Sequence, residues 1–257
     1  MTDAPESIRT PPGEPRAWLA AATVDAAVFE LRPDYRALLL TADGLRGGAS
    51  DAASERILSD AEGTARRQVA GQPPEQLAHP AAWREAYRAF GAKPQRTRPS
   101  GEALLRRLEP DGLPRIDRIT DAYNAVSIAH LLPIGGEDRA AYAGPPRLVR
   151  AEGGEPFDTT AGGEPLVEHP EPGEVVWRDD VGVTCRRWNW RQGTRTRITT
   201  DTTSAVFILD ALDPLPDDAV HAAADALTDA LLALSPDATV HRRLLDHPVR
   251  SGEGPPP

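Results

Sequence analysis

Arginine and tryptophan residues are concentrated within residues 185–197, whose sequence is CRRWNWRQGTRTR. This segment contains five arginines, two tryptophans and no acidic residue, whereas the whole chain of 257 residues has a formal net charge of −10. A guanidinium group binds phosphate or carboxylate through two parallel hydrogen bonds, and an indole stacks on a base or packs on an amino-acid side chain. One interpretation is therefore that the segment forms the wall of a binding site.

An extended strand gives a second interpretation of the same segment. Alternate residues of a strand share a face. One face would carry Cys185, Arg187, Asn189 and Arg191, and the other would carry Arg186, Trp188 and Trp190. The tryptophans would then pack in the core, while the arginines would face solvent or pair with Asp and Glu. Residue types alone favour this packing interpretation over the binding wall.

Two acidic stretches could supply a general base. Glu155 lies in GGEPFD, and Asp180 is the second residue of the pair Asp179-Asp180. A carboxylate can accept a proton from an attacking water. Acidic residues beside glycine or proline also form turns or pair with arginines. Both roles are open for these residues.

Metal and cofactor chemistry finds little support in the sequence. The six histidines have no metal-ligand spacing with one another or with Cys185, the only cysteine, so no metal site is expected. Cys185 has no evident histidine partner, which disfavours a thiol nucleophile. The chain contains no P-loop, GxGxxG or GxSxG pattern, and we expect no cofactor.

The composition is typical of a soluble globular protein, at 40% hydrophobic and 26% charged residues. No apolar run approaches the roughly 20 residues that span a bilayer. The first residues, MTDAPESIRTPPGEPR, lack the pattern of a signal peptide. We expect a cytoplasmic protein that does not bind membranes. The negative net charge argues against broad, non-specific DNA binding but allows a few arginines to contact a nucleic-acid end.

The spacing of apolar residues predicts strands near 26–31 and 36–42, with a turn at Pro33. Helices are predicted over 51–71, with Ser50 or Asp51 near the start, and over HPAAWREAYRAFG, PSGEALLRRLE and residues 115–132. In the helix over 115–132 the apolar stripe is Ile116, Ile119, Tyr123, Val126 and Leu131. The PIGG sequence is predicted to break that helix.

After about residue 145 the pattern changes to short strands, followed by a helix from about Pro216 to Pro236. The predicted strands are PRLVRA, EVVWRD, VTCRRWNW, TRITTD and SAVFILDAL. This order predicts an α+β fold with a strand-rich core and helices on one side. We expect a single domain over residues 17–250 with flexible tails at 1–16 and 251–257.

Five segments in order resemble the B3/B4 domain of the phenylalanyl-tRNA synthetase β subunit, a domain that also occurs as free-standing proteins. The segments are GAKPQRTRPSGEALLRRLE, LPRIDRITDAYNAVSIAHLLPIG, GGEPFDTTAGGE, PGEVVWRDDVGVTCRRWNWR and TRITTDTTSAVFILDAL. The resemblance covers roughly residues 85–212. The RRWNWR sequence is similar to that of the free-standing branch.

The resemblance implies a mixed fold with a β-sandwich-like core flanked by helices, and contact with a tRNA acceptor end that carries an amino acid. In the synthetase, this domain hydrolyses the ester that joins a wrong amino acid, tyrosine, to the terminal adenosine of the tRNA. The synthetase Asp-x-x-Asn helix matches Asp121 and Asn124 of this chain. Its acid-Thr pair matches Asp201 and Thr202.

The chain departs from the synthetase pattern at two places. Where the synthetase has a histidine shortly after a proline, this chain reads PIGG from Pro133. The Gly-Gly-Glu loop of the synthetase is replaced by RWNWR, residues 187–191. The amino-acid preference of the synthetase therefore does not transfer. No synthetase catalytic domain is present, so we do not expect the protein to charge tRNA.

The predicted function is that of a free-standing aminoacyl-tRNA deacylase, a hydrolase that acts on a mischarged tRNA. A water would be positioned by Asn124, Glu155 or Asp180. The substrate would be bound by Arg187, Trp188, Asn189, Trp190, Arg191, Asp121, Asp201 and Thr202. Two alternatives are a non-catalytic module that binds tRNA or an amino-acid-like ligand, and a hydrolase of small amino-acid esters or amides.

Overall fold

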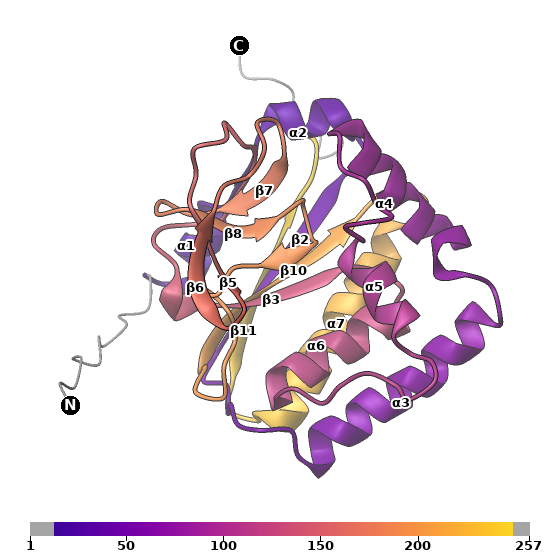
Figure 1. Cartoon of the computed structure of the whole chain (residues 1–257). Helices are drawn as coiled ribbons and strands as arrows, with labels where there is room; N and C mark the ends of the chain where they lie inside the picture. Colours follow the sequence, from indigo (N-terminus) through magenta and orange to yellow (C-terminus); the bar gives the residue numbers. More distant parts are fainter. Residues whose placement is uncertain (1–12, 249–257) are drawn as a thin grey trace.

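Two β-sheets form the centre of the molecule, which a computed structural model describes for residues 13–248 (Figure 1). A five-stranded sheet has the order β1-β4-β7-β8-β9, a four-stranded sheet has the order β11-β2-β10-β3, and a separate hairpin pairs β5 with β6. In chain order the strands are β1 (Thr23–Val24), β2 (Arg36–Asp43), β3 (Ile134–Asp138), β4 (Arg147–Arg150), β5 (Phe157–Ala161), β6 (Glu164–Glu168), β7 (Val175–Arg178), β8 (Val183–Arg186), β9 (Arg191–Gln192), β10 (Ser204–Ala211) and β11 (Thr239–Leu245).

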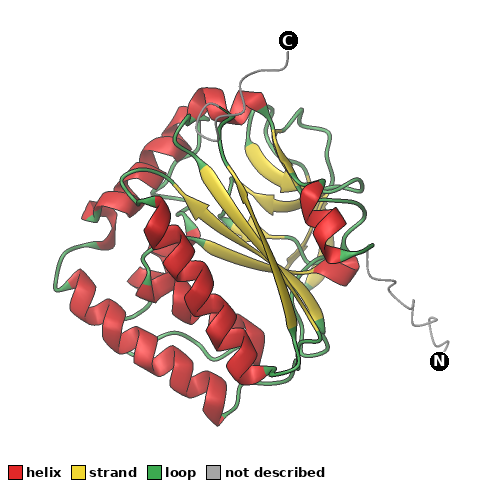
Figure 2. Cartoon of the chain, turned by 180° about the vertical axis from the view of Figure 1, so that it is seen from behind, coloured by secondary structure: helices red, strands yellow, loops and turns green. Residues whose placement is uncertain are grey.

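Helices cover the outer face of the four-stranded sheet and continue around its edge (Figure 2). In chain order the helices of the described residues are α1 (Pro15–Ala20), α2 (Ala26–Leu31), α3 (Ala52–Val69), α4 (Ala78–Ala89), α5 (Ser100–Arg106), α6 (Arg118–Ala129) and α7 (Asp217–Leu234), with short 3-10 helices η1 (Pro74–Gln76) and η2 (Arg139–Ala141). Two of the longer helices begin with a side chain that satisfies free backbone N–H groups: Asp51 caps α3 in a capping box with Ser54, and Asp117 caps α6.

The four-stranded sheet is buried on both faces. Successive side chains of β2 and β10 point to opposite faces. Leu39 and Ile208 belong to the core shared with Trp177 and Cys185 of the five-stranded sheet, whereas Leu40 belongs to the core shared with α6 and α7. Burying each such side chain contributes roughly 1.5–3 kcal/mol. This double burial explains the continuous apolar runs RALLLTA and SAVFILDA, and it confirms the predicted α+β fold with a sandwich-like core.

Several predicted elements are confirmed. The structure contains helices within 51–71, over HPAAWREAYRA and within 115–132, and strands within PRLVRA, EVVWRD and SAVFILDAL. On α6, Ile119, Tyr123 and Val126 are buried as the stripe predicts, but Ile116 lies before the helix and is 56% exposed. The helix α7 runs within the predicted range, although strand β11 follows it.

Other predicted elements are wrong. Residues 26–31 form helix α2 rather than a strand, because Val28 and Phe29 reach the core from one side of a short helix. Helix α6 ends at Ala129, before the sequence PIGG, and Ile134 of PIGG begins strand β3, in which a Cβ on Gly136 would lie 2.7 Å from Cε1 of Tyr123. This glycine is therefore needed for the close approach of β3 to α6.

The hairpin β5–β6 and strand β11 do not follow from the predicted pattern, and TRITTD contains only an isolated bridge between Glu137 and Arg197. At the N-terminus, the predicted tail of residues 1–16 overlaps α1, which begins at Pro15. Residues 1–12 of that tail and all of 251–257 lie outside the described residues.

Candidate ligand-binding site

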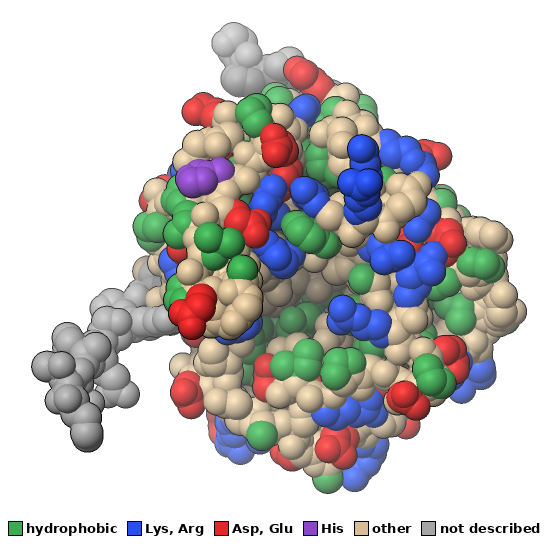
Figure 3. All heavy atoms as spheres, viewed as in Figure 1, with side chains coloured by type: hydrophobic (Ala, Val, Ile, Leu, Met, Phe, Trp, Pro, Cys, Tyr) green, Lys and Arg blue, Asp and Glu red, His purple; other side chains and the backbone are tan. Residues whose placement is uncertain are grey.

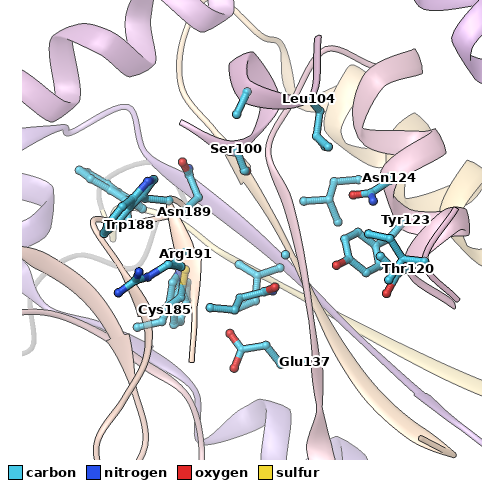
Figure 4. A pocket seen from close by; sticks show the side chains of 18 of the residues that line it. Ser100, Leu104, Thr120, Tyr123, Asn124, Glu137, Cys185, Trp188, Asn189 and Arg191 are labelled. Carbon is cyan, nitrogen blue, oxygen red and sulfur yellow. The ribbon is translucent and has the colours of Figure 1, made fainter. Parts of the chain in front are cut away.

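A cavity of about 260 Å³ opens between helices α5 and α6, strand β3 and the loop 187–190 that follows β8. Figure 4 shows Asn124 and Tyr123 of α6 on one side of this cavity, Asn189 and Arg191 on the other, and Glu137 of β3 near its base. The volume is just below the range of pockets that enclose drug-sized molecules. The cavity is therefore suited to a group of amino-acid size.

Burial distinguishes the floor of the cavity from its mouth. Glu137, Trp177 and Ile208 are at most 3% exposed and form the floor. Other lining side chains are exposed and mark the mouth of the cavity. They include Arg107, which directly follows α5, and Ile116. A ligand enters between polar and charged side chains and meets a largely apolar interior.

The loop 187–190 forms one wall of the cavity and is not part of a strand. Arg187 and Trp188 have positive φ angles of 49° and 66°, a left-handed conformation that costs about 1–2 kcal/mol per residue outside glycine. Trp188 is fully buried against Tyr35 and Trp83, which offsets that cost. The predicted alternation of faces from Cys185 to Arg191 is wrong, because the chain leaves the strand after Arg186.

Buried hydrogen bonds hold Asn189 in this loop. Its Oδ1 accepts a hydrogen bond from the Tyr87 hydroxyl at 2.9 Å, and its Nδ2 lies 3.4 Å from Asp210. The Tyr35 hydroxyl donates to the same Asp210 carboxyl at 2.6 Å. Burial raises the pKa of Asp210 to about 7. The backbone carbonyl of Asn189 also accepts from the Ser100 N–H, which joins the loop to the start of α5.

The arginines of the segment are mostly paired with carboxylates. Arg186 makes two hydrogen bonds of 2.8 Å to Glu174, and Arg191 lies 2.9 Å from Glu168. Arg195 pairs with Asp179, so the packing interpretation holds for these three side chains.

Trp190 lies at the mouth of the cavity with two cations against its ring. The guanidinium groups of Arg187 and Arg191 are 4.5 and 4.8 Å from the ring centroid. Such cation–π contacts are worth about 0.5–2 kcal/mol each. A base that stacked on Trp190 would have to share the ring with these groups or displace one. Arg187 itself does not line the cavity.

Asn124 presents an unused amide to the cavity. It lies on α6, is 7% exposed and lines the cavity, and its side chain makes no hydrogen bond to any residue within 13–248. A largely buried amide normally has a partner. A ligand or a water in the cavity is therefore the natural partner of Asn124.

Glu137 is the one carboxyl among the cavity-lining side chains of the described chain, and the sequence did not single it out. Its Oε2 accepts hydrogen bonds from the Tyr142 hydroxyl at 2.8 Å and from the Thr196 hydroxyl at 2.7 Å. Burial raises the pKa of Glu137 to about 7, although these two hydrogen bonds lower it. The two glycines before it are no signal of a cavity, because a Cβ at either would meet a neighbour, Gln192 at 3.0 Å or Tyr123 at 2.7 Å.

Two predicted carboxylates lie outside the cavity. Glu155 accepts hydrogen bonds of 2.9 Å from the backbone N–H groups of Glu152 and Gly153, so it shapes its own turn. Asp180 is 57% exposed at its side chain and pairs with Arg147 at 2.8 Å. These placements favour structural roles for both residues.

Three predicted binding residues also serve the fold. Asp121 is fully buried and accepts hydrogen bonds from the Ser50 hydroxyl and from the N–H of Ile116, which ties the start of α6 to the chain before α3. The Thr202 hydroxyl donates to Asp138 at 3.0 Å. Asp201 is exposed in the turn before β10. None of the three lines the cavity.

A shallow groove rich in arginine adjoins the mouth of the cavity. It shares Arg107, Trp190 and Arg191 with the cavity lining, and the groove lining as a whole is Arg96, Arg98, Ala103, Arg106, Arg107, Trp190 and Arg191. Figure 3 shows blue cationic side chains around a hollow on this face. Arg96 and Arg107 are exposed and have no carboxylate within ion-pair distance among residues 13–248. They are free to contact an anion.

Other chemistry is limited within the described part of the chain. Residues 13–248 contain no group of three or more His, Cys, Asp or Glu arranged to hold a metal ion. Burial raises the pKa of the Cys185 thiol well above its ordinary value, so it is not a thiolate nucleophile at neutral pH. None of the helices in this range is both long and apolar enough to span a bilayer.

Comparison with known proteins places the chain in a family. Residues 82–235 match the model of the B3/4 domain. Among solved structures, the chain is similar to an N-terminal fragment of the phenylalanyl-tRNA synthetase β subunit from Pyrococcus horikoshii, with 13% identity and a TM-score of 0.44. That similarity covers 87% of this chain and 53% of the fragment, so the chain spans about half of the fragment's length. A search of curated proteins gave no match. Because the domain model matches more than half of the chain, the protein belongs to the B3/4 domain family.

Proposed function

We propose that the protein is an aminoacyl-tRNA deacylase that acts in trans on a mischarged tRNA. The observation that carries this proposal is a cavity of amino-acid size that opens beside an arginine-rich groove on an otherwise acidic B3/4 domain protein. The aminoacyl group would occupy the cavity. The groove would bind the phosphates of the acceptor end through residues such as Arg96 and Arg107.

The geometry supports hydrolysis by positioning. The ester joins the aminoacyl group to the terminal ribose, and a cavity of about 260 Å³ that holds the aminoacyl group leaves the ribose and its nucleotide chain outside, so the carbonyl would stay near the mouth. Asn124 could hold the attacking water or the carbonyl oxygen with its unused amide. Water would add to the carbonyl carbon, the bond to the ribose oxygen would break, and the ribose hydroxyl would regain a proton. Positioning and oxyanion stabilisation can supply several kcal/mol of the barrier.

Binding without turnover is a second candidate function, and one observation favours it. The cavity lining within the described chain contains no histidine, and Gly135 stands near the place where the synthetase pattern has one. The two other predicted bases, Glu155 and Asp180, lie outside the lining. A module of this kind would protect or deliver a charged tRNA.

A panel of charged and mischarged tRNAs distinguishes these candidates. The purified protein is incubated with the pooled tRNAs, and the released amino acid is identified. The deacylase predicts release of one amino acid or a small group of them. Binding of a charged tRNA with no release from any member of the panel would contradict the deacylase and support the binding module. Equal hydrolysis of a small amino-acid ester would instead show that the tRNA is not recognised.

A further inference from the structure

Glu137 differs from every other buried glutamate in the described chain because it has no cationic partner. It is 1% exposed and forms no ion pair within residues 13–248. Each of the other four buried glutamates lies within ion-pair distance of an arginine; these pairs are Glu62–Arg115, Glu102–Arg84, Glu155–Arg178 and Glu174–Arg186. A buried carboxylate is costly unless a positive charge compensates it. The compensating group for Glu137 is therefore missing from the protein itself.

The hydrogen bonds of Glu137 leave one oxygen open. Tyr142 and Thr196 both donate to Oε2. Thr184 is a third hydroxyl near the carboxyl and lowers its pKa, but no hydrogen bond of ordinary geometry from the described residues reaches Oε1, and the side chain lines the cavity. The carboxyl is thus held in place by one oxygen, while the other is available to a group that enters from the mouth.

No charged group of the described residues around this part of the cavity forms an ion pair with Glu137, although the Arg195 guanidinium lowers its pKa. Arg191 lines the cavity but is paired with Glu168, and Arg195 is paired with Asp179. The other titratable neighbours, Tyr123, Tyr142 and Cys185, are neutral at pH 7, because burial raises the pKa of each above its ordinary value. A cationic group of a ligand at the floor would interact with one carboxylate, that of Glu137, in a medium of low dielectric constant.

The depth of the cavity decides which part of a substrate reaches Glu137. An aminoacyl ester remains tied to its ribose at the mouth, so only the far end of the amino-acid side chain extends to the floor. The interior beyond the mouth is largely apolar, with Trp188 on the wall and with Trp177 and Ile208 at the floor beside Glu137. Such walls fit an aliphatic stem.

Building on the proposed function, we propose that Glu137 selects aminoacyl groups whose side chain is an aliphatic stem that ends in an ammonium group. The stem would pack between Trp177 and Ile208, and the ammonium would donate to Glu137 Oε1. Glu137 is then a specificity-determining residue rather than the base that activates water.

The test compares two non-hydrolysable probes, the 3′-amide-linked adenosine conjugates of lysine and of norleucine. The two side chains share four carbons, and only lysine carries the ammonium. Titration calorimetry measures the dissociation constants for the wild-type protein, for Glu137→Gln and for Glu85→Gln, an exposed control on α4. We expect the lysine conjugate to bind roughly 10- to 100-fold more tightly to the wild-type protein and to the control. In Glu137→Gln the ratio should fall to about one, with norleucine binding unchanged.

Equal binding of the two probes to the wild-type protein would overturn the proposal, and this result needs no variant to fold. A preference for lysine that persists in Glu137→Gln would overturn it as well, as would binding of neither probe. The outcome for the deacylase proposal is independent of this result. If the lysine preference depends on Glu137 but no tRNA in the panel is hydrolysed, the selectivity stands and the catalytic function does not. If tRNAs are hydrolysed whether or not their amino acid carries an ammonium group, the catalytic function stands and the proposed selectivity does not.

Discussion

At the scale of single residues, two buried polar side chains make the cavity a site rather than a packing gap. Asn124 and Glu137 each keep hydrogen-bonding capacity that no residue within 13–248 uses. Their neighbour Asn189 differs, because Tyr87 and Asp210 occupy its amide. Asn124 and Glu137 can therefore bind a ligand, whereas Asn189 stabilises the wall of the cavity.

The ionisation of Glu137 should be visible in the stability of the protein. Its folded-state pKa of about 7 lies above the ordinary value of 4.5. The protonated acid therefore stabilises the fold fully below about pH 4.5, and this contribution is lost as the pH rises through about 7. Relative to wild type, we expect Glu137→Gln to gain about 2–3 kcal/mol in free energy of unfolding between pH 4.5 and pH 8.

Urea unfolding of both proteins at several pH values measures this gain. Asp210 is present in both proteins, so its own titration cancels in the comparison. A constant difference between the two proteins across this pH range would contradict the assignment.

The sequence predicted some of these residues and missed others for physical reasons. Asn124 was found because a helix with a matching Asp-x-x-Asn motif marked it. Glu137 was missed because nothing in Gly-Gly-Glu-Asp says that strand β3 carries this carboxyl into a cavity formed with α6. The chemistry of Glu155 and Asp180 fits a general base, but Glu155 is occupied by a local turn with the N–H of Gly153, and Asp180 is paired with Arg147, a contact distant in sequence.

At the scale of elements, the loop 187–190 is the feature that shapes the cavity. Strand periodicity predicted that this segment would continue β8, yet burial of Trp188 and the hydrogen bonds of Asn189 turn the chain out of the sheet. The helices α3 and α6 were predictable because caps and apolar spacing act locally. The loop was not, because Tyr35, Tyr87 and Asp210, which fix it, are distant in sequence.

The substitution Asn189→Ala tests whether these hydrogen bonds hold the loop. It leaves the Tyr87 hydroxyl without its buried acceptor and removes one donor from the Asp210 carboxyl, which keeps the hydrogen bond from Tyr35, and the loss costs about 1–3 kcal/mol. Urea unfolding should show this loss, and ligand affinity should fall because the wall is loosened. Gln192→Ala, which removes one half-buried hydrogen bond to Gly136 on the same wall, serves as a milder control. Unchanged stability of Asn189→Ala would contradict the role of this network.

At the scale of the whole molecule, charge is distributed unevenly. The chain has a formal net charge of −10, yet Arg96, Arg98, Arg106, Arg107 and Arg191 gather along one groove beside the cavity mouth. An acidic body disfavours non-specific contact with nucleic acid, whereas a local basic groove attracts a phosphate chain that fits it. Composition alone could not reveal the groove, because Arg191 joins the four arginines of residues 96–107 only in the folded chain.

Salt dependence measures the contribution of that groove. If Arg107 neutralises one phosphate of a single-stranded acceptor end, Arg107→Ala should lower the magnitude of the slope of log K against log salt by about 0.7–0.9. Binding of a tRNA to the wild-type protein and the variant is measured between 50 and 200 mM salt, a range over which such contacts weaken strongly. Arg56→Ala, on the exposed face of α3, should leave the slope unchanged. Equal slopes for all three proteins would remove Arg107 from the interface.

The central claim is that the cavity hydrolyses an aminoacyl ester, and single-turnover deacylation tests it most directly. The tRNA identified from the panel is mixed with excess wild-type protein, Asn124→Ala or Arg56→Ala, and the loss of the ester is followed in time. We predict that the wild-type protein and Arg56→Ala hydrolyse the ester at equal rates, and that Asn124→Ala is about 100-fold slower or more while still binding the tRNA. Hydrolysis by Asn124→Ala at the wild-type rate would contradict this role of the cavity.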